Sequence, residues 1–365
     1  MKLSIQREGL FKALQKISNI IASRTTLPVL ANILIEAEGS KVSLTTTDLE
    51  LRLTTSVDAK IEEPGKTTLP AKRLLGLVSK FKGETVSFST NEKHHTEIKS
   101  GTASFLLLGL GPEDFPVPPE FTSQRKLKLK QVEFARIIDR ISYAVSLDDS
   151  RKVLHGLFLS VKEGNLTAVA TDGKRLALVE KILEEAPTGA DGDIIITQKC
   201  ASEAKRVLDK DGDVFIEIGE RQVLFRIGAT IMTSKLIEGN YPNYRQVIPA
   251  NFTKKIKIPS RAFIDALEIV TVPLFDDIPC VKLTFAKGKL AFESNSANIG
   301  EGRESIDIDY ADTDISVSFN SNLLSDPFKH LDIESVSLKM NDAFSPIAVE
   351  SGDGFLYVIM PMRNK

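Results

Sequence analysis

The chain has 365 residues, 42% of them hydrophobic, and a net charge of −2 from 47 basic and 49 acidic side chains. It is too long for one ordinary core, since domains cluster near ~100 to 200 residues, so two or three domains are expected. The balanced charge excludes a protein that is basic throughout. A nucleic-acid partner would therefore have to meet locally concentrated positive charge.

The sequence indicates neither a metal centre nor a membrane segment. Cys200 and Cys280 lie far apart, without CxxC spacing or a nearby histidine, so no disulfide framework, zinc site or cofactor is expected. Charge interrupts the apolar residues of the first segment every two or three positions, unlike a signal peptide. No stretch approaches the ~18 apolar residues of a membrane helix. We therefore expect a cytoplasmic protein.

Three segments of the chain share one apolar pattern at constant offsets. The matching positions are Leu3, Leu127 and Ile256; Ile5, Leu129 and Ile258; Leu10, Phe134 and Phe263; Leu14, Ile138 and Leu267; and Ile17, Ile141 and Val270. The first two positions of each copy are spaced by two, as on one face of a strand. The later ones are spaced by four and three, as along one stripe of a helix. Each copy is therefore predicted to open with a strand and an amphipathic helix.

The rest of each copy repeats as well. Alternating segments carry Val86 and Phe88, Val214 and Ile216, and Val336 and Leu338, and strand-like alternation fills VSLTTTDLELRLTTSV, NLTAVATDGKRLALVEK and GKLAFESNSANIGEGRESIDI. A second helix is predicted near KRLLGLVSKF, from Ala71 to Gly83, and near QKCASEAKRVL and NSNLLSDPFKHL. Each copy is thus predicted to be an α+β module of about 120 residues, with two helices on an antiparallel sheet.

Proline-rich segments, GPEDFPVPPEF and GNYPNYRQVIP, mark two boundaries between the copies. They predict domains at residues 1–122, 123–250 and 251–365. Repeats joined in the same orientation make heterologous contacts, which either close into a ring or continue as a spiral.

Basic side chains recur on the predicted helices. The second helix of the first repeat carries Lys72, Arg73, Lys80 and Lys82 without an acidic residue. The second helix of the second repeat carries Lys199, Lys205, Arg206 and Lys210. The opening helices of these two repeats add Arg7, Lys12, Lys16, Arg136 and Arg140. The third repeat is poorer, with Arg261, Lys329 and His330. Such residues often only solvate a helix face, but their recurrence favours a track for phosphates. No base-reading motif is present, so binding independent of base sequence is expected.

The Thr-Asp pair recurs at Thr47-Asp48 and Thr171-Asp172, which would suit acid–base or metal chemistry, as in a metal-dependent nuclease or phosphatase. A turn explains the pair better, because the third copy reads ESNSA without this aspartate and Asx side chains commonly bond turn backbone. We therefore expect a protein that is not an enzyme.

Four motifs together carry a resemblance to a known family: TLPVLANI near the start, TDGKRLA in the second repeat, NYPNYRQVIP at the second boundary and VIMPMR at the end. In combination the chain resembles the bacterial DNA polymerase III beta subunit along essentially its whole length. The resemblance implies three DNA-clamp modules per chain and a head-to-tail homodimer that closes as a ring around duplex DNA. It implies a processivity factor rather than a catalyst.

The resemblance also implies site residues. Arg24, Arg151 and Lys152 match DNA-contacting positions and join Lys72, Arg73, Lys199 and Lys205 from the basic helices. The subunit interface would join Phe105 and Leu107 to Val272 and Pro273, with Lys99 pairing Glu301 or Glu304.

Partners of the family, which include polymerase subunits and the clamp loader, insert a short peptide between the second and third repeats. The matching wall positions are Leu154, Thr171, Gly173, Lys174, Arg175, Leu176, Pro242, Val247, Asn320, Val358, Met360, Pro361, Met362 and Arg363. Arg175 and Asn320 are expected to orient peptide polar groups, and the chain beyond Pro361 has no evident intrachain role. Gln246, Leu323 and Phe344 depart from the family pattern. A monomeric peptide-binding scaffold without a ring is the remaining alternative.

Overall fold

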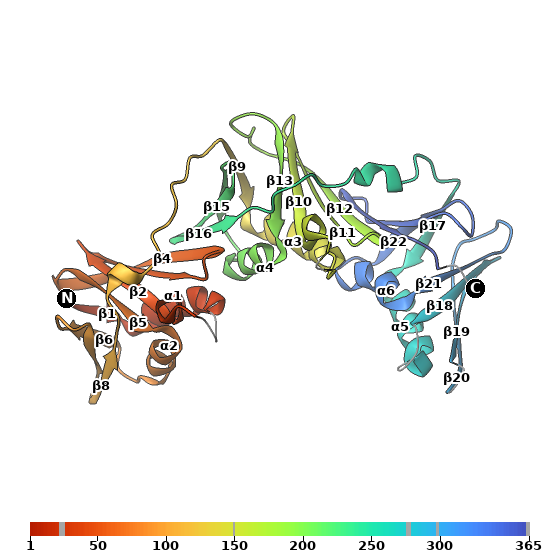
Figure 1. Cartoon of the computed structure of the whole chain (residues 1–365). Coiled ribbons are helices and arrows are strands. Elements are labelled where there is room, and N and C mark those ends of the chain that lie inside the picture. The colour runs from red at the N-terminus through yellow and green to blue at the C-terminus, as the bar shows by residue number, and fades with distance from the viewer. Residues whose placement is uncertain (22–25, 149, 275–278, 297–298, 363–365) are drawn as a thin grey trace. The chain divides into compact units, whose positions relative to one another are not determined.

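The computed structural model describes residues 1–21, 26–148, 150–274, 279–296 and 299–362 (Figure 1). The chain divides into two compact units. Unit 1 comprises Met1–Ala135, Glu184–Ala190 and Lys199–Leu236, and unit 2 comprises Arg136–Leu183, Asp191–Gln198 and Ile237–Lys365. Unit 1 therefore combines the first repeat with part of the second, and unit 2 combines the remainder of the second with the third.

The three repeats follow the same order of elements. The first contains β1 (Lys2–Gln6), α1 (Arg7–Ile17), β2 (Asn32–Glu38), β3 (Lys41–Thr47), β4 (Leu51–Glu63), β5 (Gly65–Pro70), α2 (Ala71–Lys80), β6 (Thr85–Thr90), β7 (His95–Ser100) and β8 (Ala103–Leu108). The second contains β9 (Arg125–Lys130), α3 (Gln131–Ile141), β10 (Gly156–Lys162), β11 (Asn165–Thr171), β12 (Arg175–Ile182), β13 (Gly192–Thr197), α4 (Gln198–Val207), β14 (Asp213–Ile218), β15 (Gln222–Ile227) and β16 (Thr230–Lys235). The third contains β17 (Lys254–Pro259), α5 (Ser260–Thr271), β18 (Cys280–Ala286), β19 (Lys289–Ser296), β20 (Gly300–Asp307), β21 (Ile315–Asn320), α6 (Ser321–Lys329), β22 (Ser335–Met340), β23 (Ile347–Glu350) and β24 (Phe355–Ile359).

The apolar pairs that recur in the sequence pair with one another in the structure. Leu3 lies opposite Phe88 in β1 and β6, Leu127 opposite Ile216 in β9 and β14, and Ile256 opposite Leu338 in β17 and β22. All of these side chains are buried, as are the predicted helix stripes that follow them. Burial of these faces removes apolar surface from water and so stabilises each module. The predicted strand–helix modules are therefore confirmed by their strand pairing and burial.

Each repeat consists of two half-sheets, one formed by its second to fifth strands and one by its first and last three. In unit 1 the half-sheets merge where β4 of the first repeat pairs antiparallel with β16 of the second. In unit 2 they merge where β12 of the second repeat pairs antiparallel with β24 of the third. We call these two contacts joint 1 and joint 2. The strands β8 and β20 lie at the ends of their sheets.

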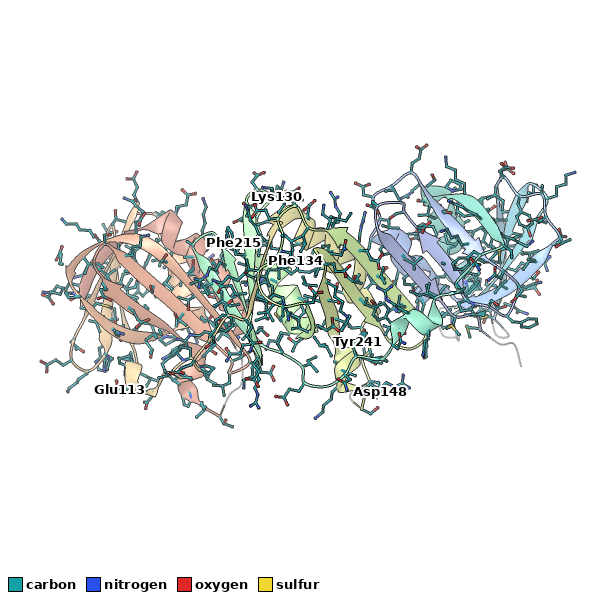
Figure 2. All side chains as sticks on the ribbon, turned by 90° about the horizontal axis from the view of Figure 1, so that it is seen from above. Glu113, Lys130, Phe134, Asp148, Phe215 and Tyr241 are labelled. Carbon is teal, nitrogen blue, oxygen red and sulfur yellow. The ribbon has the colours of Figure 1, made fainter. Side chains whose placement is uncertain are left out.

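Aromatic side chains fill the cores beneath these sheets. In unit 1, the rings of Phe134 and Phe225 stack with centroids 5.8 Å apart, with Phe134 on α3 (Figure 2). In unit 2, the rings of Phe158 and Tyr241 stack at 4.9 Å, which packs the proline-rich segment after Ile237 against the sheet. This segment is therefore part of the fold.

One detail differs from the sequence predictions. The helix α2 ends at Lys80, before the predicted Gly83, because Phe81 adopts an extended backbone and is buried, so Lys82 lies beyond the helix. Among the described residues, no helix is both long and apolar enough to cross a membrane.

Candidate functional site

The recurring Thr-Asp pairs form side-chain-stabilised turns. In unit 2, Asp172 Oδ1 accepts the backbone N–H groups of Lys174 and Arg175 at 2.8 and 3.0 Å. In unit 1, Asp48 Oδ1 accepts those of Glu50 and Leu51 at 2.9 and 2.7 Å. The turn interpretation is confirmed, since these carboxylates satisfy the backbone of their own hairpins.

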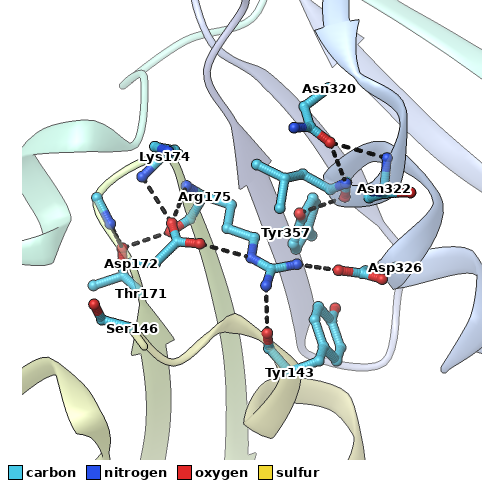
Figure 3. A network of polar contacts seen from close by, with 12 residues as sticks. Tyr143, Ser146, Thr171, Asp172, Lys174, Arg175, Asn320, Asn322, Asp326 and Tyr357 are labelled. Carbon is cyan, nitrogen blue, oxygen red and sulfur yellow. Dashed lines mark hydrogen bonds and ion pairs between the residues drawn. The ribbon is translucent and has the colours of Figure 1, made fainter. Parts of the chain in front are cut away.

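Arg175, at the start of β12, is the centre of a polar network (Figure 3). Its Nε donates to Asp172 Oδ2 at 3.1 Å, and its two terminal nitrogens donate to the carboxylate of Asp326 and to the carbonyl oxygen of Tyr143. The Arg175 side chain is only 10% exposed. A planar guanidinium with its donors in a fixed fork suits this three-way connection, which joins the second repeat to α6 of the third.

Aromatic rings surround this network. The ring of Tyr143 stacks on His330 with centroids 4.6 Å apart, and the Tyr357 hydroxyl donates to the carbonyl oxygen of Leu323 at 2.7 Å. His330 Nδ1 also lies 3.3 Å from Asp139 Oδ1. Burial raises the pKa values of Tyr143 and Tyr357 above their ordinary range, so both phenols stay neutral.

Two residues expected to orient a peptide have structural partners in the described chain. Arg175 is engaged in the network, and the Asn320 side chain caps α6 by accepting the N–H groups of Asn322 and Leu323 at 3.0 and 3.2 Å. Their contact with a peptide stays a prediction. The sequence reasoning missed Tyr143, Asp326 and Tyr357, although an aromatic residue directly after the apolar stripe of α3 was a visible signal.

The chain end has an intrachain role that the sequence reasoning did not expect. Met360 N–H donates to Lys174 O at 3.0 Å, and Met362 N–H donates to Ser318 O at 2.7 Å. The backbone thus connects the turn before β12 to β21, which corrects the expectation that the chain end has no intrachain role. The Met360 side chain remains 44% exposed.

The remaining predicted peptide-site residues divide by burial. Leu176 and Val358 belong to the buried cluster of the unit 2 sheet, and Leu154 and Thr171 are also buried. The exposed members are Gly173, Lys174, Pro242 and Val247, and Pro361 and Met362 are half-buried. Arg363 lies outside the described residues. Phe344 is 85% exposed, in a turn where Asp342 Oδ1 accepts the N–H groups of Phe344 and Ser345.

The predicted DNA-binding residues also differ in their surroundings. Lys72 and Arg73 are exposed on α2, as are Lys205 on α4 and Lys152. Lys199 forms an ion pair with Asp48, and Arg151 lies 3.7 Å from Asp148. Arg24 lies outside the described residues.

Two cations counted on the basic helices serve the fold. Arg140 is buried and lies 2.7 Å from Asp353, so it belongs to no basic surface. Arg206 donates to the carbonyl oxygens of Gln15 and Lys16 and so caps the end of α1.

The predicted interface residues lie at the two sheet ends. On β8, Phe105 is 44% exposed and Leu107 is half-buried. Beside β20, Val272 is 69% exposed and Pro273 is half-buried. Within the chain, Lys99 pairs with Glu97 at 2.7 Å and Glu301 with Arg303 at 3.1 Å. Pairing of Lys99 with Glu301 or Glu304 across an interface stays a prediction.

The chain matches three family models along its length. They describe the N-terminal, central and C-terminal domains of the DNA polymerase III beta subunit and match residues 1–119, 128–243 and 245–363. Among curated proteins, the beta sliding clamp of Caulobacter vibrioides is 33% identical over 372 residues, covering 100% of both chains. That of Chlamydia muridarum is 31% identical, covering 100% of this chain and 99% of its own.

The chain is also similar to solved structures of this family. The DNA polymerase III subunit beta of Pseudomonas aeruginosa has a TM-score of 0.95 at 31% identity, covering 100% of both chains. A sliding clamp of that organism has been solved bound to griselimycin, with the same TM-score, identity and coverage. The Caulobacter crescentus clamp, with a TM-score of 0.93 at 32% identity and full coverage of both chains, has polyethylene glycol bound to a putative beta-motif tethering region.

Proposed function

This chain belongs to the DNA polymerase III beta subunit family, the beta sliding clamps, and from that premise we propose that it holds polymerases on duplex DNA by enclosing the duplex. It is a non-catalytic processivity factor. Enclosure keeps a bound polymerase at a high effective concentration near the primer end without tight contacts to the bases. The protein acts in the cytoplasm, where DNA is replicated.

The pattern of strand pairing supports the ring most directly. Joints 1 and 2 each pair the fourth strand of one repeat with the last strand of the next, which leaves β20 and β8 as the equivalent strands without a joint in the chain. An edge strand leaves backbone N–H and C=O groups unpaired and so is a template for another chain. The strand β8 also exposes Phe105, Leu106 and Leu108. Two copies joined head to tail through these strands form a closed assembly of six repeats.

The interior of that ring meets DNA through phosphates. Lys72 and Arg73 are exposed and form no ion pair within the described part of the chain, so both can contact an outside partner. With Arg24, Arg151, Lys152, Lys199 and Lys205 they provide contacts that are independent of base sequence. Such contacts weaken steeply with salt and permit sliding.

The peptide site of the proposed clamp lies where β12 and β24 pair. Exposed apolar groups at Met360, Val247 and Phe344 can receive the apolar end of a peptide, while Lys174 offers a charge. The flexible Met360 and Met362 side chains allow several partner sequences to bind. Partners are polymerase subunits, the clamp loader and other proteins with a short clamp-binding peptide. The proposed domains are residues 1–122, 123–250 and 251–365.

The decisive experiment loads the protein on a nicked circular plasmid with a clamp loader and ATP and then linearises the DNA. Enclosure predicts that the protein stays on the circle and is lost through the free ends. Equal retention on circular and linear DNA would contradict it. Light scattering tests the alternative of a monomeric scaffold, since a closed pair has twice the subunit mass of 40.1 kDa.

A further inference from the structure

The opening strand of each repeat pairs along one edge in the same way, β1 with β6, β9 with β14 and β17 with β22, but the other edge differs between repeats. In the first repeat, β1 pairs antiparallel with the end of β4, where Ser4 lies opposite Lys60. In the second, Thr188 exchanges two backbone hydrogen bonds with Lys126 of β9, at 3.1 and 2.9 Å. In the third, β17 has no second partner strand among the described residues. We call this side the open edge of β17.

The pairing with β22 shows which backbone groups face the open edge. The Ser260 N–H donates to the Glu334 carbonyl oxygen at 2.9 Å, and the bonds of an antiparallel pair alternate, so Ile258 bonds toward β22. Lys257 therefore turns its N–H and carbonyl oxygen to the open edge. Ser4, at the matching place of β1, faces β4 in the same manner. Lys257 thus offers one donor and one acceptor to an extended backbone.

A hollow of about 580 Å³ lies beside the open edge. Lys257 and Pro259 of β17 line one side, and Asp307, Ile308 and Asp309, at the end of β20 and just beyond it, line the other. Its volume is within the range of about 300–1,000 Å³ that is usual for binding pockets. Pro259 has no N–H, and proline within a sheet is found at edges. The hollow therefore adjoins backbone groups that are available for pairing.

The same place is closed in the first repeat. The Ala59 N–H donates to the Ser40 carbonyl oxygen at 2.9 Å, and the Ile308 N–H donates to that of Gly288 at 3.1 Å, so Ile308 matches Ala59. Ala59 lies opposite Ile5 of β1. Ile308, in contrast, has no partner on β17 within the described chain, and the hollow takes the place of that pairing. The third repeat thus leaves space where the first repeat has two paired strands.

The hollow is acidic. Three carboxylates, those of Asp307, Asp309 and Glu334, line it together with one ammonium group, that of Lys257. All three carboxylates are exposed, and none forms an ion pair within the part of the chain that the structure describes. Ile308 is only 7% exposed and provides an apolar floor. An extended segment with basic side chains is complementary to this lining.

We infer that the open edge of β17 binds an extended, basic segment of a partner protein by β-strand addition, with backbone bonds to Lys257 and basic side chains beside Asp307, Asp309 and Glu334. Alternate side chains of a strand point to opposite faces, so residues between the basic ones can cover Ile308. All of these residues belong to unit 2, so the surface depends neither on the proposed ring nor on the proposed peptide site.

A second copy of this chain fits the open edge less well. Two β17 edges paired with each other would set Lys255 and Lys257 of one copy against the same lysines of the other. Like charges on directly opposite strand positions are destabilising. The acidic lining and the basic strand therefore favour a different protein as the occupant.

Peptide binding to the full-length protein tests the inference. The probe is a fluorescent peptide of alternating lysine and valine, Lys-Val-Lys-Val-Lys with blocked ends, and its anisotropy is measured at low salt. The control peptide has the same sequence with every backbone nitrogen methylated, so it keeps the charge but has no backbone donor. The unmethylated peptide is expected to bind with a dissociation constant below ~1 mM, about tenfold or more tighter than the control. Equal affinity of the two peptides, or no binding of either, would overturn the inference.

Two substitutions of Lys257 separate backbone pairing from charge. Lys257→Pro removes the N–H at the open edge and leaves the bonds to β22, so probe affinity should fall about tenfold or more. Lys257→Ala keeps the N–H and removes only an ammonium group that repels the probe, so affinity should stay equal or rise. Equal affinities of the two folded variants would overturn the backbone pairing. If circular dichroism shows that Lys257→Pro is unfolded, the methylated peptide decides this point.

Neutral substitutions test the acidic lining. Asp307→Asn together with Asp309→Asn should weaken probe binding about three- to tenfold at low salt. Asp312→Asn is the matched control, because Asp312 lies outside the hollow and pairs with Lys254 at 3.3 Å, and it should leave the affinity almost unchanged. Equal weakening by the control would show a general effect of net charge and overturn the assignment of the lining.

Two further measurements exclude other occupants. Met360→Ala together with Met362→Ala alters the peptide site proposed above and should leave binding of this probe unchanged. Loss of probe binding in that variant would assign the probe to the other site and overturn the inference. Light scattering over a concentration series tests self-pairing, and an association that Lys257→Pro abolishes would assign the open edge to a second copy instead.

Discussion

Replacing Phe105 by alanine perturbs the proposed subunit contact most strongly. Phe105 is 44% exposed in the single chain, and an aromatic side chain buries about 150–250 Å² when covered, so about 90 Å² of its surface remains to be buried on association. At about 25 cal/mol per Å² this stabilises each contact by ~2 kcal/mol. Because a ring of two copies has two such contacts, the dimer loses ~4–5 kcal/mol, or about a thousandfold in dissociation constant.

Sedimentation equilibrium over a dilution series measures this constant directly. Phe344→Ala is the matched control, since Phe344 is 85% exposed in the turn between β22 and β23, which belong to a different sheet from β8 and from β20. Its removal should leave the dimer constant unchanged. Circular dichroism checks that Phe105→Ala remains folded, because Phe105 also packs on Phe81 with ring centroids 5.9 Å apart. A dimer constant within threefold of the native value in folded Phe105→Ala protein would refute the reasoning.

Three further outcomes are expected. Asp326→Asn should lower the free energy of unfolding of unit 2 by about 1.5–3 kcal/mol in urea titrations, because it removes the charged acceptor of Arg175 while the other partners of Arg175 remain. An unchanged urea midpoint would contradict a role of Asp326 in stabilising joint 2. Replacing Met360 and Met362 by alanine should weaken polymerase-peptide binding by about tenfold in calorimetry without changing the dimer mass, and unchanged affinity would remove the site assignment. Replacing Lys72 and Arg73 by alanine should reduce the slope of log affinity for duplex DNA against log salt by about two, and an unchanged slope would place both away from phosphates.

The repeated modules were predictable because their signal is local. Spacings of two, three and four residues identify which side chains share one face of a strand or helix, and Leu3 and Phe88 then pair because each must bury an apolar face. The turn at Asp172 was predictable for the same reason, since an Asx side chain bonds the backbone of its own hairpin.

The contacts between repeats were not predictable in this way. The pairing of β4 with β16 depends on backbone groups that every residue carries, so composition contains little sign of it. The network around Arg175 draws Tyr143 and Asp326 from distant parts of the sequence, and the family resemblance pointed to Arg175 as a peptide contact. The hydrogen bonds of Met360 and Met362 likewise use main-chain atoms, so the sequence contained no sign that the chain end is bonded within the chain.

Topological enclosure is tested most directly by closing both subunit contacts covalently after loading. The protein would be loaded on nicked circular DNA, its subunits joined with a cleavable amine-reactive cross-linker, and the sample placed in detergent. The account predicts that the cross-linked ring stays on the circle in detergent and is released by cutting the DNA or by cleaving the cross-links. Complete release from uncut circles in detergent, despite quantitative cross-linking of both contacts, would contradict it.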